Sequence, residues 1–312
     1  MIHSLPVAAV FWTPIDAASA LTTHHSPPPP AATAISVTSF PSDIATIGKT
    51  ASVHRRMSLA HVDVLFFDVF GTVVDWLHTV SDELHSTIKA APHPDPSIQR
   101  QLLTHDWEDF TKQWRAGYMK VTRELAKTGN PEKITVDAMH RTILDRLVAE
   151  TEHLSEAWDE EVLSRLNLTW HHLRPWPDSV RGLRELKRQF KVGTLTNGNL
   201  SLMVDMAKYG DLGWDFILTA DLLKTFKPDP QMYRQAMALA GLDVVVEARR
   251  AAMVAAHLHD LEAAKAQGMS TVFVRRETED QLDDPAQVPP YVDVVVGDLE
   301  ELSRIAGGLP MA

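Results

Sequence analysis

Residues 62–72 of the chain are VDVLFFDVFGT, an apolar run that ends in a carboxylate and a glycine turn. The continuous run at 64–67 is typical of a strand buried in a parallel sheet. Similar runs recur late in the chain, at residues 192–195, 216–218, 251–255, 271–274 and 292–296. Helical segments lie between most of them, at residues 201–209, 230–240 and 261–267. Because strands that alternate with helices form βαβ units, we predict an α/β fold with a doubly wound, Rossmann-like parallel sheet.

A helical insertion is predicted between the first strand and the rest of the sheet. Residues 81–177 contain no strand-like run, and helical stretches cover 81–90, 98–125, 135–149 and 159–172. Ligands in open α/β sheets bind beyond the carboxyl ends of the strands, so we expect these helices to form a cap over that edge. The predicted core comprises residues 61–80 and 178–312, and the predicted cap comprises residues 81–177.

The composition is that of a globular protein without disulfides. The 312 residues are 45% hydrophobic and 23% charged, include no cysteine and carry a net charge of −11. At about 150 residues per domain, this length corresponds to about two domains. The acidic balance argues against nucleic acid as a partner but leaves room for a small anionic substrate. The lack of cysteine excludes thiolate chemistry and favours a cytoplasmic location. No apolar run approaches the about 20 residues of a membrane-spanning helix.

Residues 1–60 differ in composition from the rest. They include four consecutive prolines at 27–30, and no hydrophobic period in them lasts longer than one helical turn. A segment that buries so little apolar surface does not offset its chain entropy, so we predict that it is disordered. Two alternatives stay open. One is a mitochondrial targeting peptide, against which the absence of arginine before Arg55 argues, and the other is a true start at Met57.

Polar residues follow the first two predicted strands. Asp68 comes directly after the first strand, with Gly71 and Thr72 in the turn behind it. A carboxylate at this place suits a nucleophile, and its alternative role is to cap the turn. Thr196 and Asn197 follow the second strand, where a hydroxyl and an amide suit an anion cradle, although Asn-Gly is also a common turn.

Charged residues follow the third and fourth strands. Asp229 and Pro230 are explained as the start of a helix, which leaves Lys227 as the functional candidate unless it is a solvated loop lysine. Tyr233 lies six positions on and could point to the same edge. Asp260 follows the fourth strand and either acts in chemistry or caps the next helix.

A zinc site near Asp260 is disfavoured. His257 and His259 are two positions apart, so they do not share a helix face, and the chain has no cysteine. We therefore predict no metal ligand here.

Taken in order, these motifs resemble those of the haloacid dehalogenase superfamily over about residues 62–305. Phosphatases of that superfamily carry a second Asp two positions after the nucleophile, which protonates the departing alkoxide, and this chain has Phe70 there. Their magnesium-binding Asp after the fourth strand corresponds to Ala256. A halide needs no proton to leave, so both differences favour the dehalogenase branch.

Three details resemble the L-2-haloacid dehalogenases in particular. The motif at 68–72 has the aromatic residue of their opening motif, Lys227 and Tyr233 keep their six-residue spacing, and Trp114-Arg115 resembles their cap motif. The resemblance implies attack by Asp68 on the carbon that bears the halogen, and hydrolysis of the resulting ester by a water that Asp260 activates or orients.

The resemblance also implies roles for the remaining residues. Lys227 keeps Asp68 ionised, Arg115 receives the halide, and apolar walls come from Phe70 and Met119. Orientation of the substrate carboxylate and the nucleophile falls to Thr72, Thr196 and Asn197. No cofactor is implied, and a homodimer is common among such enzymes.

The fourth motif departs from this pattern. Dehalogenases commonly have Ser and Asn where this chain has Ala255 and His257, and an aromatic residue where it has His259. His257 can still donate a hydrogen bond, whereas Ala255 cannot. Two alternatives to a dehalogenase stay open: another hydrolase of the superfamily, such as a magnesium-dependent phosphatase, and a catalytically silent binding protein with this fold.

Overall fold

The computed structural model describes residues 59–128, 135–282 and 287–307, which all belong to one unit of the chain, Ser52–Ala312. The predictions for residues 1–60 therefore concern almost only residues outside the described part. No helix among the described residues is long and apolar enough to cross a membrane.

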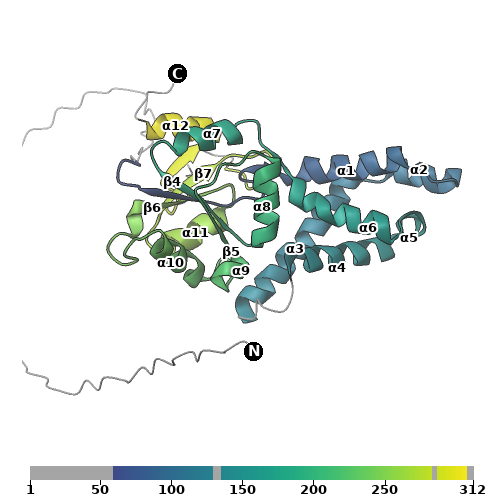
Figure 1. The fold of residues 1–312 in the computed structure, drawn as a ribbon, viewed down its shortest axis with the longest axis horizontal. Helices are drawn as coiled ribbons and strands as arrows, with labels where there is room; N and C mark the ends of the chain where they lie inside the picture. Colours follow the sequence, from purple (N-terminus) through teal and green to yellow (C-terminus); the bar gives the residue numbers. More distant parts are fainter. Residues whose placement is uncertain (1–58, 129–134, 283–286, 308–312) are drawn as a thin grey trace, which may run out of the picture. The chain divides into compact units, whose positions relative to one another are not determined.

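Within the described part, six parallel strands form one sheet in the order β5-β4-β1-β6-β7-β8 (Figure 1). All six predicted strands are confirmed, and their bounds are β1 Val64–Phe67, β4 Lys191–Thr196, β5 Phe216–Thr219, β6 Ala251–Ala255, β7 Ser270–Val274 and β8 Val294–Val296. β1 lies in the middle, where Val64 pairs with Lys191 on one side and Ala251 on the other. The predicted α/β fold is therefore correct.

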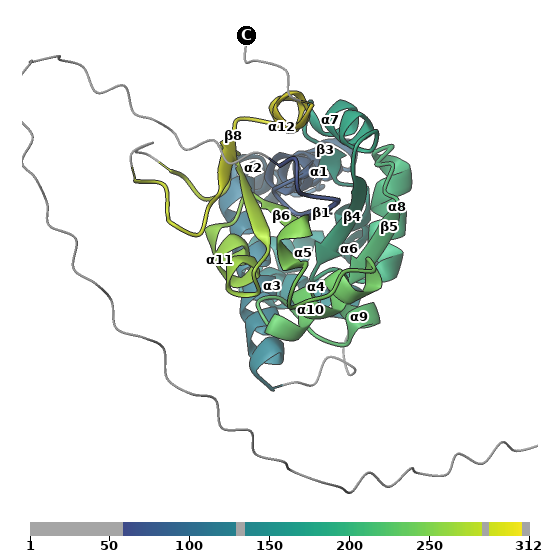
Figure 2. The same cartoon turned by 90° about the vertical axis from the view of Figure 1, so that its left-hand side faces the viewer.

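The two faces of the sheet bury alternate residues of β1. Leu65 and Phe67 pack with α7 (Ser179–Leu186), α8 (Leu200–Tyr209) and α12 (Leu299–Ala306). Val64 and Phe66 pack with helices on the other face, which are α9 (Ala220–Leu223), α10 (Pro230–Leu239) and α11 (Leu258–Ala266). Figure 2 shows the two groups of helices on opposite sides of the sheet. A strand covered on both faces is apolar at every position, which explains the continuous run at 64–67.

A helical insertion follows β1, as predicted. It contains α1 (Trp76–Ala90), α2 (Pro96–Thr104), α3 (Trp107–Thr128), α4 (Val136–Ala149), α5 (Glu152–Ala157), α6 (Glu160–Asn167) and the 3-10 helix η2 (Leu168–His172). A short antiparallel pair, β2 (Val74–Asp75) with β3 (Arg174–Pro175), joins its two ends. We propose this pair as the boundary between core and cap.

Three details of the predicted cap were wrong. The first helix begins at Trp76 rather than residue 81, because the Asp75 side chain caps it by accepting from the His78 N–H. The strand β3 lies inside a range that was expected to hold no strand. The predicted helix 98–125 is two helices, since His105 is extended and Asp106 accepts the Asp109 N–H at 2.9 Å, which starts a new helix.

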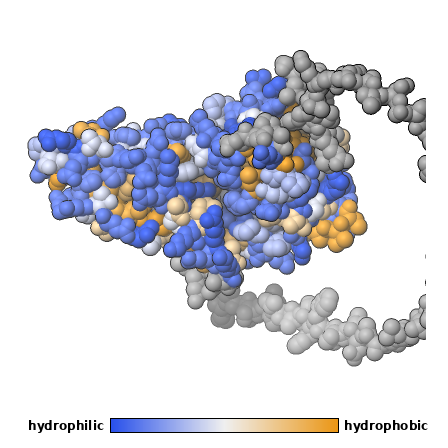
Figure 3. All heavy atoms as spheres, turned by 180° about the vertical axis from the view of Figure 1, so that it is seen from behind, coloured by the Kyte–Doolittle hydropathy of each residue, from blue (hydrophilic) through white to orange (hydrophobic). Residues whose placement is uncertain are grey.

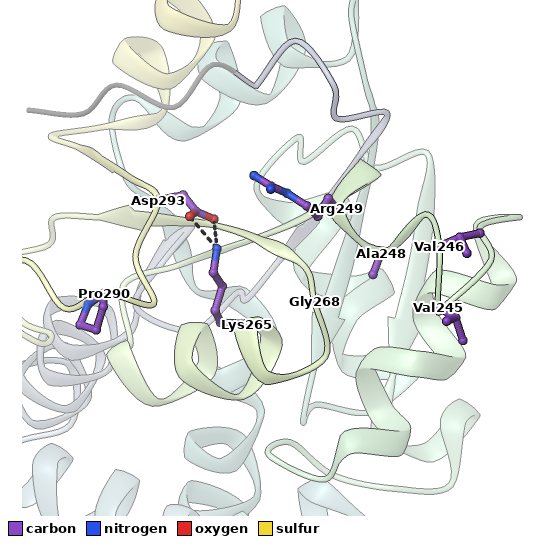
Figure 4. Close-up of a pocket in the computed structure, with 8 residues that line it drawn as sticks. All are labelled: Val245, Val246, Ala248, Arg249, Lys265, Gly268, Pro290 and Asp293. Atoms are coloured by element: carbon purple, nitrogen blue, oxygen red, sulfur yellow. Dashed lines mark hydrogen bonds and ion pairs between the residues drawn. The ribbon is translucent and has the colours of Figure 1, made fainter. Parts of the chain in front are cut away.

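A hollow of about 710 Å³ lies at the amino ends of β6, β7 and β8 (Figure 4). Its charged residues are Arg249, Lys265 and Asp293, and Lys265 Nζ donates to both carboxylate oxygens of Asp293 at 2.6 Å. At its rim, Val245 and Val246 are 84% and 79% exposed. The face seen in Figure 3 is mostly hydrophilic, with a few hydrophobic patches. The polar residues that follow the strands, in contrast, lie at the opposite edge of the sheet.

Candidate active site

A buried ion cluster lies at the carboxyl ends of the strands. Asp68 follows β1, Lys227 lies between β5 and α10, and Asp260 is in the first turn of α11. Lys227 Nζ donates to Asp68 Oδ1 at 2.7 Å and to Asp260 Oδ2, and all three residues are almost fully buried. The parallel topology thus brings together residues that are up to 192 positions apart in sequence, as their numbers 68 and 260 show.

The electrostatics of the cluster keep Asp68 ionised. Burial raises the pKa of Asp68, but the charge of Lys227 and the hydrogen bond from His257 outweigh burial and hold that pKa well below its usual value. Burial lowers the pKa of Lys227, but Asp260 and Asp68 outweigh it and raise that pKa. The result is a carboxylate that is charged yet almost fully buried.

Thr72 orients the second oxygen of this carboxylate. Its Oγ1 donates to Asp68 Oδ2 at 2.8 Å and accepts the Ala256 N–H at 2.9 Å. The hydroxyl is therefore fully engaged inside the protein. Thr72 acts on the Asp68 carboxylate and is not among the residues that line the cavity above it.

His257 links Asp68 to a carboxylate that the sequence motifs did not include. Its Nδ1 lies 3.0 Å from Asp68 Oδ2, and its Nε2 lies 2.8 Å from Glu279 Oε2. Burial lowers the pKa of His257, but these two hydrogen bonds outweigh burial and raise the pKa to about 10. At neutral pH the ring is therefore an imidazolium that donates to both carboxylates.

Gly71 makes room for Glu279. Its φ is +81°, and a Cβ built on Gly71 would lie 2.3 Å from the carboxyl carbon of Glu279. The other Glu279 oxygen, Oε1, accepts from Trp76 Nε1 at 2.7 Å and from Thr278 Oγ1 at 2.8 Å. The turn after Asp68 thus needs glycine for its backbone conformation and for the close approach of this side chain.

The cap supplies a second cation above Asp68. Arg115, on α3, stacks over the rings of Phe70 and Tyr118 at 4.9 and 5.3 Å. Its Nη1 is buried and has no hydrogen-bond partner among the described residues. The cavity between core and cap measures about 30 Å³, and it is lined by Asp68, Phe70, Arg115, Tyr118, Met119, Thr196, Asn197, Lys227, His257, His259 and Asp260.

Two predicted substrate-binding residues serve other contacts. The Asn197 side chain accepts the Lys227 N–H at 2.7 Å and donates to the Lys227 carbonyl at 3.1 Å, so it positions the lysine loop. Tyr233 is fully buried and does not line the cavity; its hydroxyl has no partner among the described residues. Thr196 lines the cavity, and its Oγ1 accepts the Gly198 N–H at 3.1 Å.

The comparison with protein families agrees with this geometry. A model of the haloacid dehalogenase-like hydrolases matches residues 62–268. The chain belongs to this family.

Curated and solved relatives of this haloacid dehalogenase-like hydrolase are dehalogenases by name. The (S)-2-haloacid dehalogenase H-109 of Pseudomonas putida is 25% identical over 219 residues, which cover 69% of this chain and 87% of that relative. The crystal structure of the L-2-haloacid dehalogenase PA0810 is 32% identical with a TM-score of 0.67, and the match covers 79% of this chain and 99% of the other. The structure of the defluorinating L-2-haloacid dehalogenase Rha0230 is 34% identical with a TM-score of 0.66, and covers 78% and 94%. These matches confirm the resemblance to the L-2-haloacid dehalogenase branch.

The residues of this haloacid dehalogenase-like hydrolase do not fit a magnesium ion. Asp68, His257 and Asp260 offer ligand atoms within 4.8 Å of one another. However, the Lys227 ammonium bonds to both carboxylates, and His257 is an imidazolium with both nitrogens engaged. The side chain of Ala256 offers no oxygen, and Ala256 stands where the phosphatases of the superfamily have their magnesium-binding Asp. The donor set favours chemistry without a metal.

Sequence reasoning missed Glu279, Trp76 and the cavity position of His259 in this hydrolase. Glu279 lies after β7, outside the motifs, and nothing in its neighbourhood in the sequence marks it. The available signal was Gly71, whose missing side chain leaves space for another group, but the sequence does not say which one.

Proposed function

We propose that the protein is a hydrolytic dehalogenase that converts short (S)-2-haloacids to 2-hydroxy acids through an ester on Asp68. The observation that carries this proposal is the pairing of an ionised, buried Asp68 with the unpartnered Arg115 Nη1 across a small cavity. Phe70, at the position of a phosphatase's acid, makes the cavity unsuited to a leaving group that needs a proton.

In the first step, an oxygen of Asp68 attacks the carbon that bears the halogen, and that carbon inverts. The carbon–halogen bond breaks, and the halide leaves with the electron pair toward Arg115. Lys227 and Thr72 hold the attacking carboxylate in place. Phe70 and Met119 line the cavity and exclude water from the nucleophile and the halide.

In the second step, a water attacks the carbonyl carbon of the Asp68 ester. The ester bond to the substrate breaks, the 2-hydroxy acid leaves, and the original carboxylate is restored. Asp260, fixed by Lys227, borders the cavity and orients this water. We assign the substrate carboxylate to the side of the cavity formed by Thr196 and Asn197.

The named relatives and the charges around the cavity support a small anionic substrate. Lys227 and Arg115 border the cavity, and these two cations suit a short carboxylic acid. Because one of the matched structures is of a defluorinating enzyme, fluoroacetate belongs among the compounds to test. We propose that no cofactor takes part. A cytoplasmic location and a homodimer stay predictions, to be tested by fractionation and light scattering.

Halide release from L-2-chloropropionate, D-2-chloropropionate, chloroacetate and fluoroacetate tests the proposal. The reactions contain EDTA, Asp68→Asn is the control variant, and p-nitrophenyl phosphate with magnesium is assayed in parallel. We expect halide from the L isomer that resists EDTA and disappears in Asp68→Asn.

Other outcomes would contradict the proposal. Magnesium-dependent phosphate release without halide would identify a phosphatase despite Phe70 and Ala256. No product in any assay would favour a binding role. Halide release that survives Asp68→Asn would contradict the ester mechanism itself.

A further inference from the structure

The proposed function leaves the proton transfers of ester hydrolysis unassigned. Hydrolysis of the ester requires a group that takes a proton from the attacking water and returns it to the departing alkoxide. Asp260 is held by the fully buried Lys227 through Oδ2, and its Oδ1 lies 3.5 Å from His259 Nε2. His257, in contrast, contacts the reacting carboxylate directly.

We infer that His257 is the acid–base group of ester hydrolysis and that Glu279 is its positioning residue. This inference deepens the proposed function and rests on it. It assigns a titratable side chain to ester hydrolysis. The dehalogenases that this chain resembles commonly have Asn, which does not titrate, at the position of His257.

The geometry places one nitrogen on the reaction and the other on a fixed support. His257 Nδ1 lies 3.0 Å from Asp68 Oδ2, so it is within reach of a water that attacks the Asp68 carbonyl carbon. Nε2 bonds to Glu279 Oε2 at 2.8 Å. Trp76 and Thr278 donate to the other oxygen of Glu279 and so fix this carboxylate. The imidazole of His257 therefore cannot rotate without losing its hydrogen bond to Glu279.

The charges around His257 change when the ester forms. Asp68 and Glu279 bond to the ring, His259 lies with its ring centroid 5.5 Å away, and Lys227 and Asp260 complete the cluster. Alkylation neutralises Asp68, which removes one of the two carboxylates that favour the imidazolium. His257 then loses a proton to solvent and becomes a neutral base that is still held by Glu279.

The proton count of the whole reaction closes. Water adds to the ester carbon and gives one proton to Nδ1 of His257. The bond between that carbon and the substrate oxygen breaks, and the alkoxide takes this proton to become the 2-hydroxy acid. Asp68 is left as a carboxylic acid and passes its proton to His257, which restores the ion pair. Hydrolysis of a carbon–halogen bond releases one proton overall, and this is the proton that His257 lost to solvent after alkylation.

Rapid-quench kinetics with L-2-chloropropionate and intact-protein mass spectrometry test the inference. For His257→Gln we expect a burst of one halide per active site and accumulation of the ester. The burst rate changes by less than about tenfold, the effect of one lost hydrogen bond. Ester hydrolysis slows by about 10²-fold or more, the contribution of a general base.

The pH profile separates chemistry from structural damage. Wild-type ester hydrolysis should slow at low pH, where His257 is protonated, and this acid limb should vanish in His257→Gln. Glu279→Gln should move the limb to lower pH, because it removes the remaining carboxylate charge, and Glu279→Asp should restore part of the shift. If His257→Gln does not fold, His257→Asn gives the same readout.

His61→Gln is the matched control, since His61 bonds to Ser270 at the amino end of β7, away from the site. It should leave the burst, the ester lifetime and the acid limb unchanged. Turnover of His257→Gln without ester accumulation, or with the wild-type acid limb, would overturn the inference alone. A wild-type protein that forms no ester would instead overturn the proposed function.

Discussion

Gly71 shows how much depends on one missing side chain. Gly71 and Gly241 both have a positive φ, +81° and +84°, but only Gly71 has a neighbour, the Glu279 carboxyl group, where a Cβ would lie. We expect Gly241→Ala to lower the free energy of unfolding by about 1–2 kcal/mol, the strain of a left-handed alanine. Gly71→Ala should cost more and should also slow ester hydrolysis, because it displaces Glu279.

Urea unfolding and single-turnover kinetics of the two glycine variants check this expectation. Equal unfolding free energies with normal ester hydrolysis in both would show that the contact with Glu279 has no energetic weight.

Lys227 is the residue on which the buried charges depend. Lys227→Met leaves Asp260 buried without Lys227 and leaves Asp68 with His257 alone, and breaking a buried pair in this way costs about 3–5 kcal/mol. Denaturant unfolding at neutral pH measures the loss, with the exposed Lys191→Met as the control, which should change stability by less than about 0.5 kcal/mol. At acid pH, where carboxylates are neutral, the free energy of unfolding of Lys227→Met should come closer to that of the wild type. A difference between the two proteins that does not change with pH would argue against a charge effect.

Sequence reasoning identified the ion cluster because each member stands directly after, or one loop beyond, an apolar strand. Parallel strands bring such positions to one edge, so Asp68, Lys227 and Asp260 were predictable together. Glu279 was not, because the loop after β7 is irregular and its course depends on packing against Gly71 and Trp76. The contact between Asn197 and Lys227 was not predictable for a similar reason, since the Asn197 amide bonds to a backbone that only the folded loop presents.

At the scale of elements, a histidine joins the cap to the core. His171, in η2, bonds through Nε2 to Asp137 on α4 at 3.0 Å and through Nδ1 to Asp205 on α8 at 2.8 Å. The hydrogen bond to Asp137 raises the pKa of His171, although burial opposes it. A raised pKa in the folded state means that the stabilisation is complete below the unfolded pKa of 6.5 and is lost as pH rises through the folded value.

We therefore expect amide hydrogen exchange in η2 and at the start of α4 to become faster, relative to exchange in β1, as pH rises above 6.5. The comparison uses exchange rates corrected for the intrinsic pH dependence of amide exchange. His171→Gln should abolish this pH dependence. His172→Gln is the matched control, because His172 is exposed and its ring makes an edge-to-face contact with Tyr209. A wild-type ratio that does not change with pH would contradict the expectation.

The strands and most helices were predictable because burial on two faces and apolar periodicity mark them in the sequence. Asp229 also caps α10 as expected, since its side chain accepts the Gln231 N–H at 2.8 Å. The break at His105 was not predictable, because the ring of His105 packs on Trp107 at 4.5 Å and a long apolar period hides the interruption. Two-residue strands such as β3 leave too short a pattern to detect.

At the scale of the whole molecule, a ligand in the cavity contacts core and cap together. Core residues Asp68 and Lys227 and cap residues Arg115 and Met119 line the same space, within one unit of the chain. We expect L-2-chloropropionate to raise the melting temperature of Asp68→Asn, and core and cap should still unfold in a single transition. At a ligand concentration of a hundred times the dissociation constant, the free energy of unfolding should rise by about 2.7 kcal/mol. The D isomer is the control and should have a smaller effect. Equal shifts for both isomers would contradict the proposed stereochemistry.

The contact between Gly71 and Glu279 also has a consequence for how this lineage evolves. The acid at 279 fits only against a glycine at position 71, and that acid has little reason to persist without a histidine at 257. We therefore expect positions 257 and 279 to change together among natural homologues, whereas Gly71 stays glycine because its φ is +81°. Lineages with Asn at 257 should have lost the acid, and lineages with His should retain both the acid and the glycine.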